Sequence, residues 1–318
     1  MTKTAKPAAP KLIPQRGGSA PLPWTVTKEA RNIHTVELLG TSRTNEWWFL
    51  LSSDRHHDNP HARHDQELKH LEEAVAKRAG ILDLGDQGCL MEGRHDPRRA
   101  RKGVREEHMD APDYLDSVIR HASEFYAPYA RNFVVIGRGN HEDSVLKNCD
   151  TDYTERVCER MSMLSGHKVY PGGYGGWVRF WTRINGERYG LALKYFHGAG
   201  GAPLMSHGTL SVRRHAAIMP DADVVCTGHI HKRWIVPINR ERLVCDRGGT
   251  RIVQDYQWHC CTGSYKDAYG DGYGGWEVMK GMPPGESGGG IWMRLYLEKR
   301  SAEGRTRYGL VPQFIMAD

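Results

Sequence analysis

The stretch FVVIGRGNHED, residues 133–143, combines a short apolar run with an abrupt polar end. The run from Phe133 to Ile136 predicts a buried strand, and the glycine-rich turn after it places Asn140 and His141 at the tip of that strand. Polar side chains at the end of a strand lie at the rim of a sheet, where open α/β folds bind ligands. A plain turn that starts a surface helix has the same pattern, so the rest of the chain must distinguish the two.

The composition is that of an ordinary globular protein. Of the 318 residues, 26% are charged and 39% are apolar, which argues against wholesale disorder. The formal net charge of +6 suits an anionic substrate but does not by itself indicate nucleic acid. Seven cysteines without a CxxC pair predict free thiols in a reducing compartment. No apolar run approaches the roughly 20 residues of a membrane span, so we expect a cytoplasmic protein.

The order of apolar and polar segments predicts one α/β domain. Residues 1–24, rich in Pro, Ala, Lys and Gly, predict a flexible tail, so the expected domain covers residues 25–318. After an irregular stretch, three apolar runs alternate with three amphipathic helices, which predicts a sheet flanked by helices. The runs cover residues 47–51, 81–84 and 133–136, and the helices cover about 65–80, 112–130 and 154–164. The second half is richer in strands, with Asn185-Gly186 as a hairpin turn.

Residues that commonly bind metals follow five of the expected strands. These are Asp54-Arg55-His56, Gly85-Asp86, Asn140-His141, His197 and Gly228-His229-Ile230-His231. Carboxylates, imidazoles and one amide, without a thiolate, suit Mn²⁺, Zn²⁺ or Fe²⁺ better than Ca²⁺. One shared carboxylate with three further ligands on each side would hold two ions about 3.5–4 Å apart.

These motifs, in this order, resemble the calcineurin-like metallophosphoesterases over residues 54–231. The resemblance implies a four-layer α/β/β/α sandwich, in which two sheets pack face to face and helices cover them. It also implies a phosphoester hydrolase that uses two divalent metal ions, with Mn²⁺ favoured and Zn²⁺ or Fe²⁺ as alternatives. The nucleophile implied by the resemblance is a metal-bound hydroxide that attacks phosphorus in line with the leaving oxygen.

The resemblance assigns a role to each motif residue. One metal ion is held by Asp54, His56, Asp86 and His231. The other is held by Asp86, Asn140, His197 and His229, so that Asp86 bridges the two ions. His141 contacts the phosphate and protonates the leaving oxygen, and Glu142 or Asp143 is a candidate to orient it. Arg138 is a candidate for a clamp on a substrate phosphate, with plain surface charge as the alternative.

Other segments leave alternatives open. The tract around Asp54 also offers His57, Asp58, His61 and His64 as ligands, and family members more often have an apolar residue where Arg55 stands. The basic loop at residues 94–105 is a candidate contact for nucleic-acid phosphates, or else a solvated loop. The aromatic, glycine-rich segment at residues 265–276 is a candidate for base stacking, or else a loop that caps the core.

The form of the motifs favours one branch of the family. Gly-His-x-His resembles the phosphodiesterase and nuclease branch, whereas Gln87-Gly88-Cys89 departs from the Asp-Arg-Gly of the protein phosphatases. The pieces EWWFLLSSDRHHDNP and TGSYKDAYGDGYGGW resemble members encoded by bacteriophages and prophages, which would act in the host cytoplasm. We therefore expect a phosphodiesterase for DNA, RNA or a nucleotide. The alternatives are a phosphomonoesterase and a nucleic-acid-binding protein that has this fold without turnover.

Overall fold

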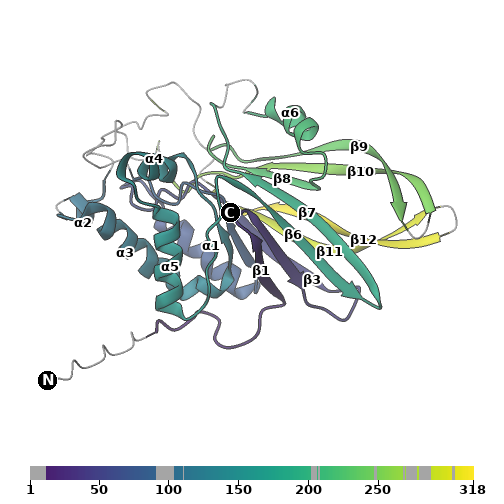
Figure 1. The fold of residues 1–318 in the computed structure, drawn as a ribbon, viewed down its shortest axis with the longest axis horizontal. Coiled ribbons are helices and arrows are strands. Elements are labelled where there is room, and N and C mark those ends of the chain that lie inside the picture. The colour runs from purple at the N-terminus through teal and green to yellow at the C-terminus, as the bar shows by residue number, and fades with distance from the viewer. Residues whose placement is uncertain are drawn as a thin grey trace.

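The chain forms a mixed α/β structure with two β-sheets, as the computed structural model shows (Figure 1). The structure describes residues 12–90, 104–109, 111–201, 206, 208–246, 249–267, 269, 278, 288–302 and 305–318. None of the helices in these ranges is both long enough and apolar enough to cross a membrane.

The five-stranded sheet has the order β12-β11-β3-β4-β5. Strands β3 (Glu46–Ser52), β4 (Gly80–Asp83) and β5 (Phe133–Ile136) are parallel, so their carboxyl ends meet at one edge. Their continuous apolar runs fit strands that are covered on both faces. The sheet is extended by an antiparallel hairpin of β11 (Ile291–Ala302) and β12 (Arg305–Met316).

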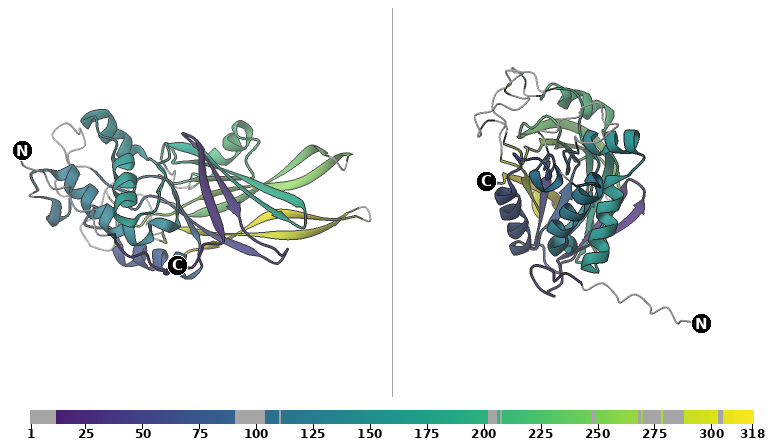
Figure 2. Two further views of the ribbon diagram at one scale, coloured as in Figure 1. Left: turned by 60° about the horizontal axis from the view of Figure 1, so that its bottom comes forward. Right: turned by 90° about the vertical axis from the view of Figure 1, so that its left-hand side faces the viewer.

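Helices cover the outer face of the five-stranded sheet, and Figure 2 shows them gathered at one end of the molecule. Their apolar side chains, such as Leu71, Ala122 and Val157, form one core with Leu50 and Ile81 of the sheet. The helical elements of this region are α1 (His64–Ala76), α2 (Glu106–Met109), α3 (Tyr114–Tyr126), η2 (Ala127–Asn132), α4 (Asn140–Cys149) and α5 (Tyr153–Ser165).

The seven-stranded sheet packs face to face on the five-stranded one. Its strands, in spatial order, are β1 (Trp24–Ala30), β2 (Ile33–Leu38), β6 (Gly175–Ile184), β7 (Glu187–Phe196), β8 (Val224–Thr227), β10 (Gly249–Cys261) and β9 (Trp234–Asp246). The two sheets share one apolar core, in which the rings of Phe49 and Phe180 lie 4.7 Å apart. Strands β7 and β8 are parallel, so their carboxyl ends also meet at one edge.

The structure confirms the expected mixed α/β fold with two sheets. On the outer face of the seven-stranded sheet, the helix among the described residues is α6 (Ser211–Ile218), which lies beside β9 (Figure 1). The complete four-layer arrangement therefore stays a prediction. The Asn185-Gly186 turn is confirmed: Ile184 pairs with Glu187, and the two turn residues have φ of 52° and 82°.

Two expectations for the N-terminal region need correction. Residues 25–45, expected to be irregular, contain most of β1 and all of β2, in which exposed polar side chains interrupt the apolar signal. Part of the expected tail lies against the helices, because Ile13 N donates to Leu164 O at 2.7 Å and Arg16 N to Pro128 O at 2.8 Å. Residues 1–11 lie outside the described part of the chain.

Candidate metal centre

The five motifs meet where the carboxyl ends of the parallel strands of both sheets converge. The five-stranded sheet supplies Asp54, His56, Asp86 and Asn140, which follow β3, β4 and β5. The seven-stranded sheet supplies His197, His229 and His231, which follow β7 and β8. Hydrogen bonds join the two sets, since His229 N donates to Asp54 Oδ2 at 2.9 Å and His197 Nδ1 donates to Leu84 O at 3.0 Å.

Asp54, His56 and His231 form the first group of potential ligands. One ligand atom from each lies within 4.8 Å of the others. His231 Nε2 is 3.2 Å from Asp54 Oδ1 and 3.3 Å from His56 Nε2. Asp54 is fully buried, whereas the His231 side chain is 18% exposed, so this group is reached from solvent past His231.

Asp86, His197 and His229 form the second group, and their ligand atoms also lie within 4.8 Å of one another. His197 Nε2 is 3.1 Å from Asp86 Oδ2 and 3.2 Å from Asn140 Oδ1. His229 Nδ1 is 2.7 Å from the same Asn140 oxygen. The structure thus brings the seven predicted ligand side chains into two groups, with Asn140 in the second, and the hydrogen bond from His229 N to Asp54 Oδ2 joins the two groups.

The backbone is left-handed at most of these ligands. Nine non-glycine residues in the described ranges have positive φ, and five of them are predicted ligands. These five are Asp54 (53°), His56 (46°), Asp86 (52°), His229 (71°) and His231 (55°). Such a conformation costs of order 1 kcal/mol or more per residue, and it clusters at functional sites where the surrounding structure enforces it.

Glu142 holds the loops of the centre together. Its buried carboxylate accepts hydrogen bonds from Asp86 N at 3.0 Å, Gly139 N at 2.8 Å and Gly88 N at 3.1 Å. Burial, reinforced by the nearby Asp86 charge, raises the pKa of Glu142 to about 8. Glu142 therefore joins the loop after β4 to the start of α4, and the expectation that it orients His141 is wrong.

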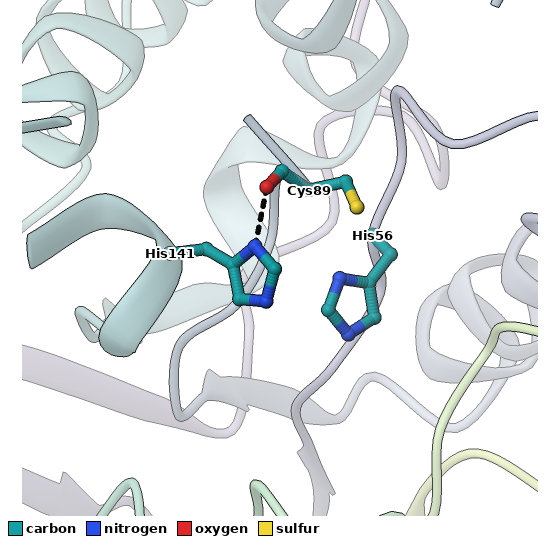
Figure 3. A group of neighbouring side chains, drawn as sticks. All are labelled: His56, Cys89 and His141. Carbon is teal, nitrogen blue, oxygen red and sulfur yellow. Dashed lines mark hydrogen bonds between the residues drawn. The ribbon is translucent and has the colours of Figure 1, made fainter. Parts of the chain in front are cut away.

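His141 is instead oriented by a backbone carbonyl. Its Nδ1 donates to the carbonyl oxygen of Cys89, and its ring meets His56 edge to face at 4.9 Å between centroids (Figure 3). The Nε2 atom then faces the centre, 3.8 Å from Asp86 Oδ2, and the side chain is 14% exposed. Asp143, the other expected partner, is bound to Arg138. Because every residue type has a main-chain carbonyl, this hydrogen bond could not be predicted from the sequence.

Arg138 lies between two carboxylates. Its Nε is 2.6 Å from Asp143 Oδ1, and its Nη1 is 3.3 Å from Asp152 Oδ2. These two carboxylates balance the charge of the guanidinium without a substrate. A contact between Arg138 and a substrate phosphate stays a prediction.

Arg55 is buried behind the ligands that flank it in sequence. Its Nε is 2.7 Å from Asp83 Oδ2, its Nη1 is 3.0 Å from Glu67 Oε1, and its Nη2 donates to Ser52 Oγ at 2.9 Å. The side chain has no exposed surface. Arg55 therefore connects the ends of β3 and β4 with α1, which explains why a charged residue stands at this position.

The alternative ligands in the histidine-rich tract have other partners. Asp58 accepts hydrogen bonds from the backbone of Cys89 and Leu90. His57 Nδ1 donates to Glu67 Oε2 at 2.9 Å, and His64 Nε2 donates to the His57 carbonyl at 2.8 Å. These residues support the loops around the centre, and the structure does not place them among the seven.

The two candidate nucleic-acid contacts lie largely outside the described residues. Of the basic loop, residues 94–103 are outside, and Arg105 pairs with Glu107 at 2.8 Å. Of the aromatic segment, Tyr265 is buried, with its hydroxyl 2.9 Å from His70 Nδ1 and its ring beside Arg55. Tyr265 is thus a core residue. Residues 268 and 270–276 are not among those described.

The protonation pattern of the centre suits divalent cations. Burial opposes ionisation of Asp54, but His231 outweighs it and lowers the pKa of Asp54 to about 2. Burial likewise opposes ionisation of Asp86, yet His141 and His197 hold its pKa well below the usual range. Burial lowers the pKa of His56 and His229, so both are neutral and can donate a lone pair.

His197 differs from the other histidines. Burial would lower its pKa, but Asp86 raises it to about 10, so cation binding at this position releases a proton. Two ionised carboxylates, imidazoles and an amide match the donors that Mn²⁺, Zn²⁺ and Fe²⁺ prefer. Ligand atoms bound to one ion at about 2.0–2.2 Å lie roughly 3–4 Å apart, as the contacts in both groups do. The residues present therefore fit divalent metal ions.

No protein-family model matches the chain, and no curated protein matches it. Solved structures with some similarity include vacuolar protein sorting 29 of Cryptosporidium parvum, at 13% identity and a TM-score of 0.35, covering 84% of this chain and 98% of that one. Vps29 of Entamoeba histolytica, complexed with Zn²⁺, is 12% identical with a TM-score of 0.29, covering 83% and 98%. A predicted phosphoesterase of Streptococcus pneumoniae is 12% identical with a TM-score of 0.28, covering 84% and 99%. These similarities are low, and they carry no function over to this chain.

Proposed function

We propose that this protein is a metal-dependent phosphoesterase that hydrolyses a phosphodiester, with nucleic acid or a nucleotide as the substrate. The observation that carries the proposal is the convergence of seven candidate ligand side chains beside a partly exposed imidazole, His141. Asp54, His56, Asp86 and His231 would hold one divalent ion. Asp86, Asn140, His197 and His229 would hold the other, with Mn²⁺ as the favoured metal.

When bound, the two ions would supply an acidified water as the nucleophile and neutralise charge on the phosphate oxygens. Asn140 contributes a ligand oxygen without adding negative charge. His141 protonates the leaving oxygen from Nε2, because its Nδ1 is committed to the Cys89 carbonyl and its Nε2 faces the centre. The burial of Asp54, Asp86 and His197 excludes water from the back of the site.

A pocket of about 500 Å³ is lined by residues next in sequence to three of the ligands, and it supports a substrate with two ester groups. It is bounded by Gly198, Gly228 and Ile230, which neighbour His197, His229 and His231 in sequence. Its wall also contains cationic Lys194 and Arg214. The second substituent of a diester, such as a nucleoside with an adjoining phosphate, matches a wall that is partly cationic and partly apolar. The apolar wall is formed by Phe196, Leu210, Ile218, Met219 and Trp234.

The proposal is tested by comparing hydrolysis of bis-p-nitrophenyl phosphate and p-nitrophenyl phosphate in the presence of Mn²⁺. We expect faster cleavage of the diester and loss of activity with EDTA. Faster cleavage of the monoester would instead indicate a phosphomonoesterase. If the metal-loaded protein binds DNA or RNA and cleaves no ester, the binding protein without turnover is the better assignment.

His141→Ala is expected to lower kcat by roughly 10²–10⁴-fold for a dinucleotide, because its alkoxide leaving group needs a proton. The loss should be much smaller for bis-p-nitrophenyl phosphate, since p-nitrophenolate departs without protonation. Metal analysis should show unchanged metal content. His167→Ala is the control, at a histidine outside the five motifs whose backbone N donates to Ser165 Oγ. An equal loss on both substrates, or the loss of an ion, would contradict the role of His141 as the acid.

A further inference from the structure

A second group of histidines lies outside the proposed dinuclear centre, on α2 and α3. We propose that Glu107, His108 and His121 form a separate binding site for Zn²⁺. One ligand atom from each of the three residues lies within 4.8 Å of the others. None of them belongs to the motifs that build the dinuclear centre.

His108 carries the strongest indication. It is 2% exposed, and its Nδ1 is 2.9 Å from Ser117 Oγ. In the tautomer that donates the Nδ1 proton to this hydroxyl, Nε2 presents a lone pair, and no hydrogen-bond partner among the described residues reaches this buried atom. It lies 4.0 Å from Glu107 Oε1. A buried nitrogen without a partner is costly, and a cation between it and the carboxylate would satisfy both groups.

His121 completes the set of ligands. Its Nε2 is 3.5 Å from the same Glu107 oxygen, and its ring lies edge to face with that of His108 at 5.3 Å between centroids. Two ligand atoms bound to one zinc ion at about 2.0–2.2 Å are roughly 3–4 Å apart, so little movement would be needed. Two imidazoles and one carboxylate, with water in the fourth position, are an established ligand set for zinc.

The hydrogen bonds around the group resemble the outer partners of metal sites. A histidine ligand usually donates its second ring N–H to a neighbouring acceptor, which fixes the ring and its tautomer. Ser117 does this for His108. Because Ser117 and His121 both belong to α3 whereas Glu107 and His108 belong to α2, an ion here would join the two helices.

The charged residues around Glu107, His108 and His121 are compatible with a bound cation. Arg105 donates to Glu107 through Nε at 2.8 Å and Nη2 at 3.4 Å, but a carboxylate has about four acceptor positions and can serve both cations. Burial lowers the pKa of His108, opposed by Asp58, and burial together with His57 lowers the pKa of His121 to about 4. Both imidazoles are therefore neutral at pH 7, and no proton has to be displaced for zinc to bind.

The test is the number of zinc ions bound per chain, measured by mass spectrometry after equilibration with Zn²⁺ and gel filtration. His121→Ala is expected to bind one zinc fewer than the wild type and to keep the hydrolysis of bis-p-nitrophenyl phosphate. In an Asp86→Asn background, His121→Ala should again remove one zinc, so the result does not depend on the dinuclear centre. A His121→Ala protein that has the wild-type circular dichroism spectrum and binds as many zinc ions as the wild type would overturn the proposal.

A second variant keeps all three ligands and guards against misfolding. Ser117→Ala removes only the partner of His108 Nδ1, so we expect zinc affinity at this site to fall by about 10–100-fold. Competition with a chromophoric chelator measures this affinity in the Asp86→Asn background. Ser144→Ala makes the same chemical change on α4, where the hydroxyl contacts Asn148, and should leave the affinity unchanged. Equal affinities in Ser117→Ala and Ser144→Ala would count against the site.

Discussion

Asp86→Asn is expected to abolish hydrolysis and to lower the content of bound divalent metal. The carboxylate joins the start of α4 to the second ligand group, since Oδ1 accepts from His141 N at 2.9 Å and Oδ2 lies 3.1 Å from His197 Nε2. The Asn side chain has nearly the same shape as that of Asp but no charge. Both ions would therefore bind less tightly at the proposed bridging position. A loss of several kcal/mol of transition-state stabilisation corresponds to roughly 10³-fold or more in kcat.

The chain offers a closely matched control for this change. Asp150 is exposed and has φ of 50°, close to the 52° of Asp86, so Asp150→Asn makes the same substitution in the same backbone conformation. We expect Asp150→Asn to keep both activity and metal content. The measurement is kcat on bis-p-nitrophenyl phosphate with saturating Mn²⁺, together with metal analysis. An Asp86→Asn protein that keeps two ions and more than about a tenth of kcat would show that Asp86 does not bridge them.

Arg55→Ala is expected to cause the largest loss of stability, about 3–5 kcal/mol in the free energy of unfolding. The substitution leaves the carboxylates of Asp83 and Glu67 buried without their guanidinium partner. Urea denaturation at neutral pH measures the loss. Part of it should be recovered at acidic pH, because protonation removes the two uncompensated charges. Burial already raises the pKa of Asp83 to about 6 against the pull of Arg55.

Arg156→Ala is the control for the removal of an arginine from an ion pair. Arg156 pairs with Asp116 at the surface, where the two side chains are 41% and 49% exposed. An exposed pair contributes at most about 1 kcal/mol. If Arg55→Ala costs no more than Arg156→Ala, the buried cluster does not stabilise the fold in the way its geometry indicates.

Much of the fold and of the centre could be predicted because both depend on simple patterns. Parallel strands that are covered on both faces are continuous apolar runs, and this identified β3, β4 and β5. Since the carboxyl ends of such strands meet, polar residues far apart in the sequence could be expected side by side. Strands β1 and β2 were missed because one of their faces is polar, which divides their apolar signal into single residues.

The remaining features depend on partners that the sequence does not reveal. Arg55 is stable in the core only because Glu67 and Asp83 reach it from α1 and β4, at separations of 12 and 28 residues. His141 is fixed by a main-chain carbonyl, which every residue type carries. Neighbouring histidines also separate in space, with His56 facing the centre and His57 facing Glu67. The spacing of the histidines in the sequence does not determine which of them faces the centre.

The ligands of the proposed centre come from two sheets, so a bound ion would link the sheets to each other. His56 and His231 are separated by 175 residues, yet their Nε2 atoms lie 3.3 Å apart across the junction of the sheets. An ion held there would close a very long loop of the chain. It would therefore reduce the conformational freedom of the unfolded chain, much as a cross-link does. Neither sheet has a full set of ligands, so hydrolysis could begin only in a molecule whose two halves have docked. Catalytic activity would then appear only after the two sheets have packed together.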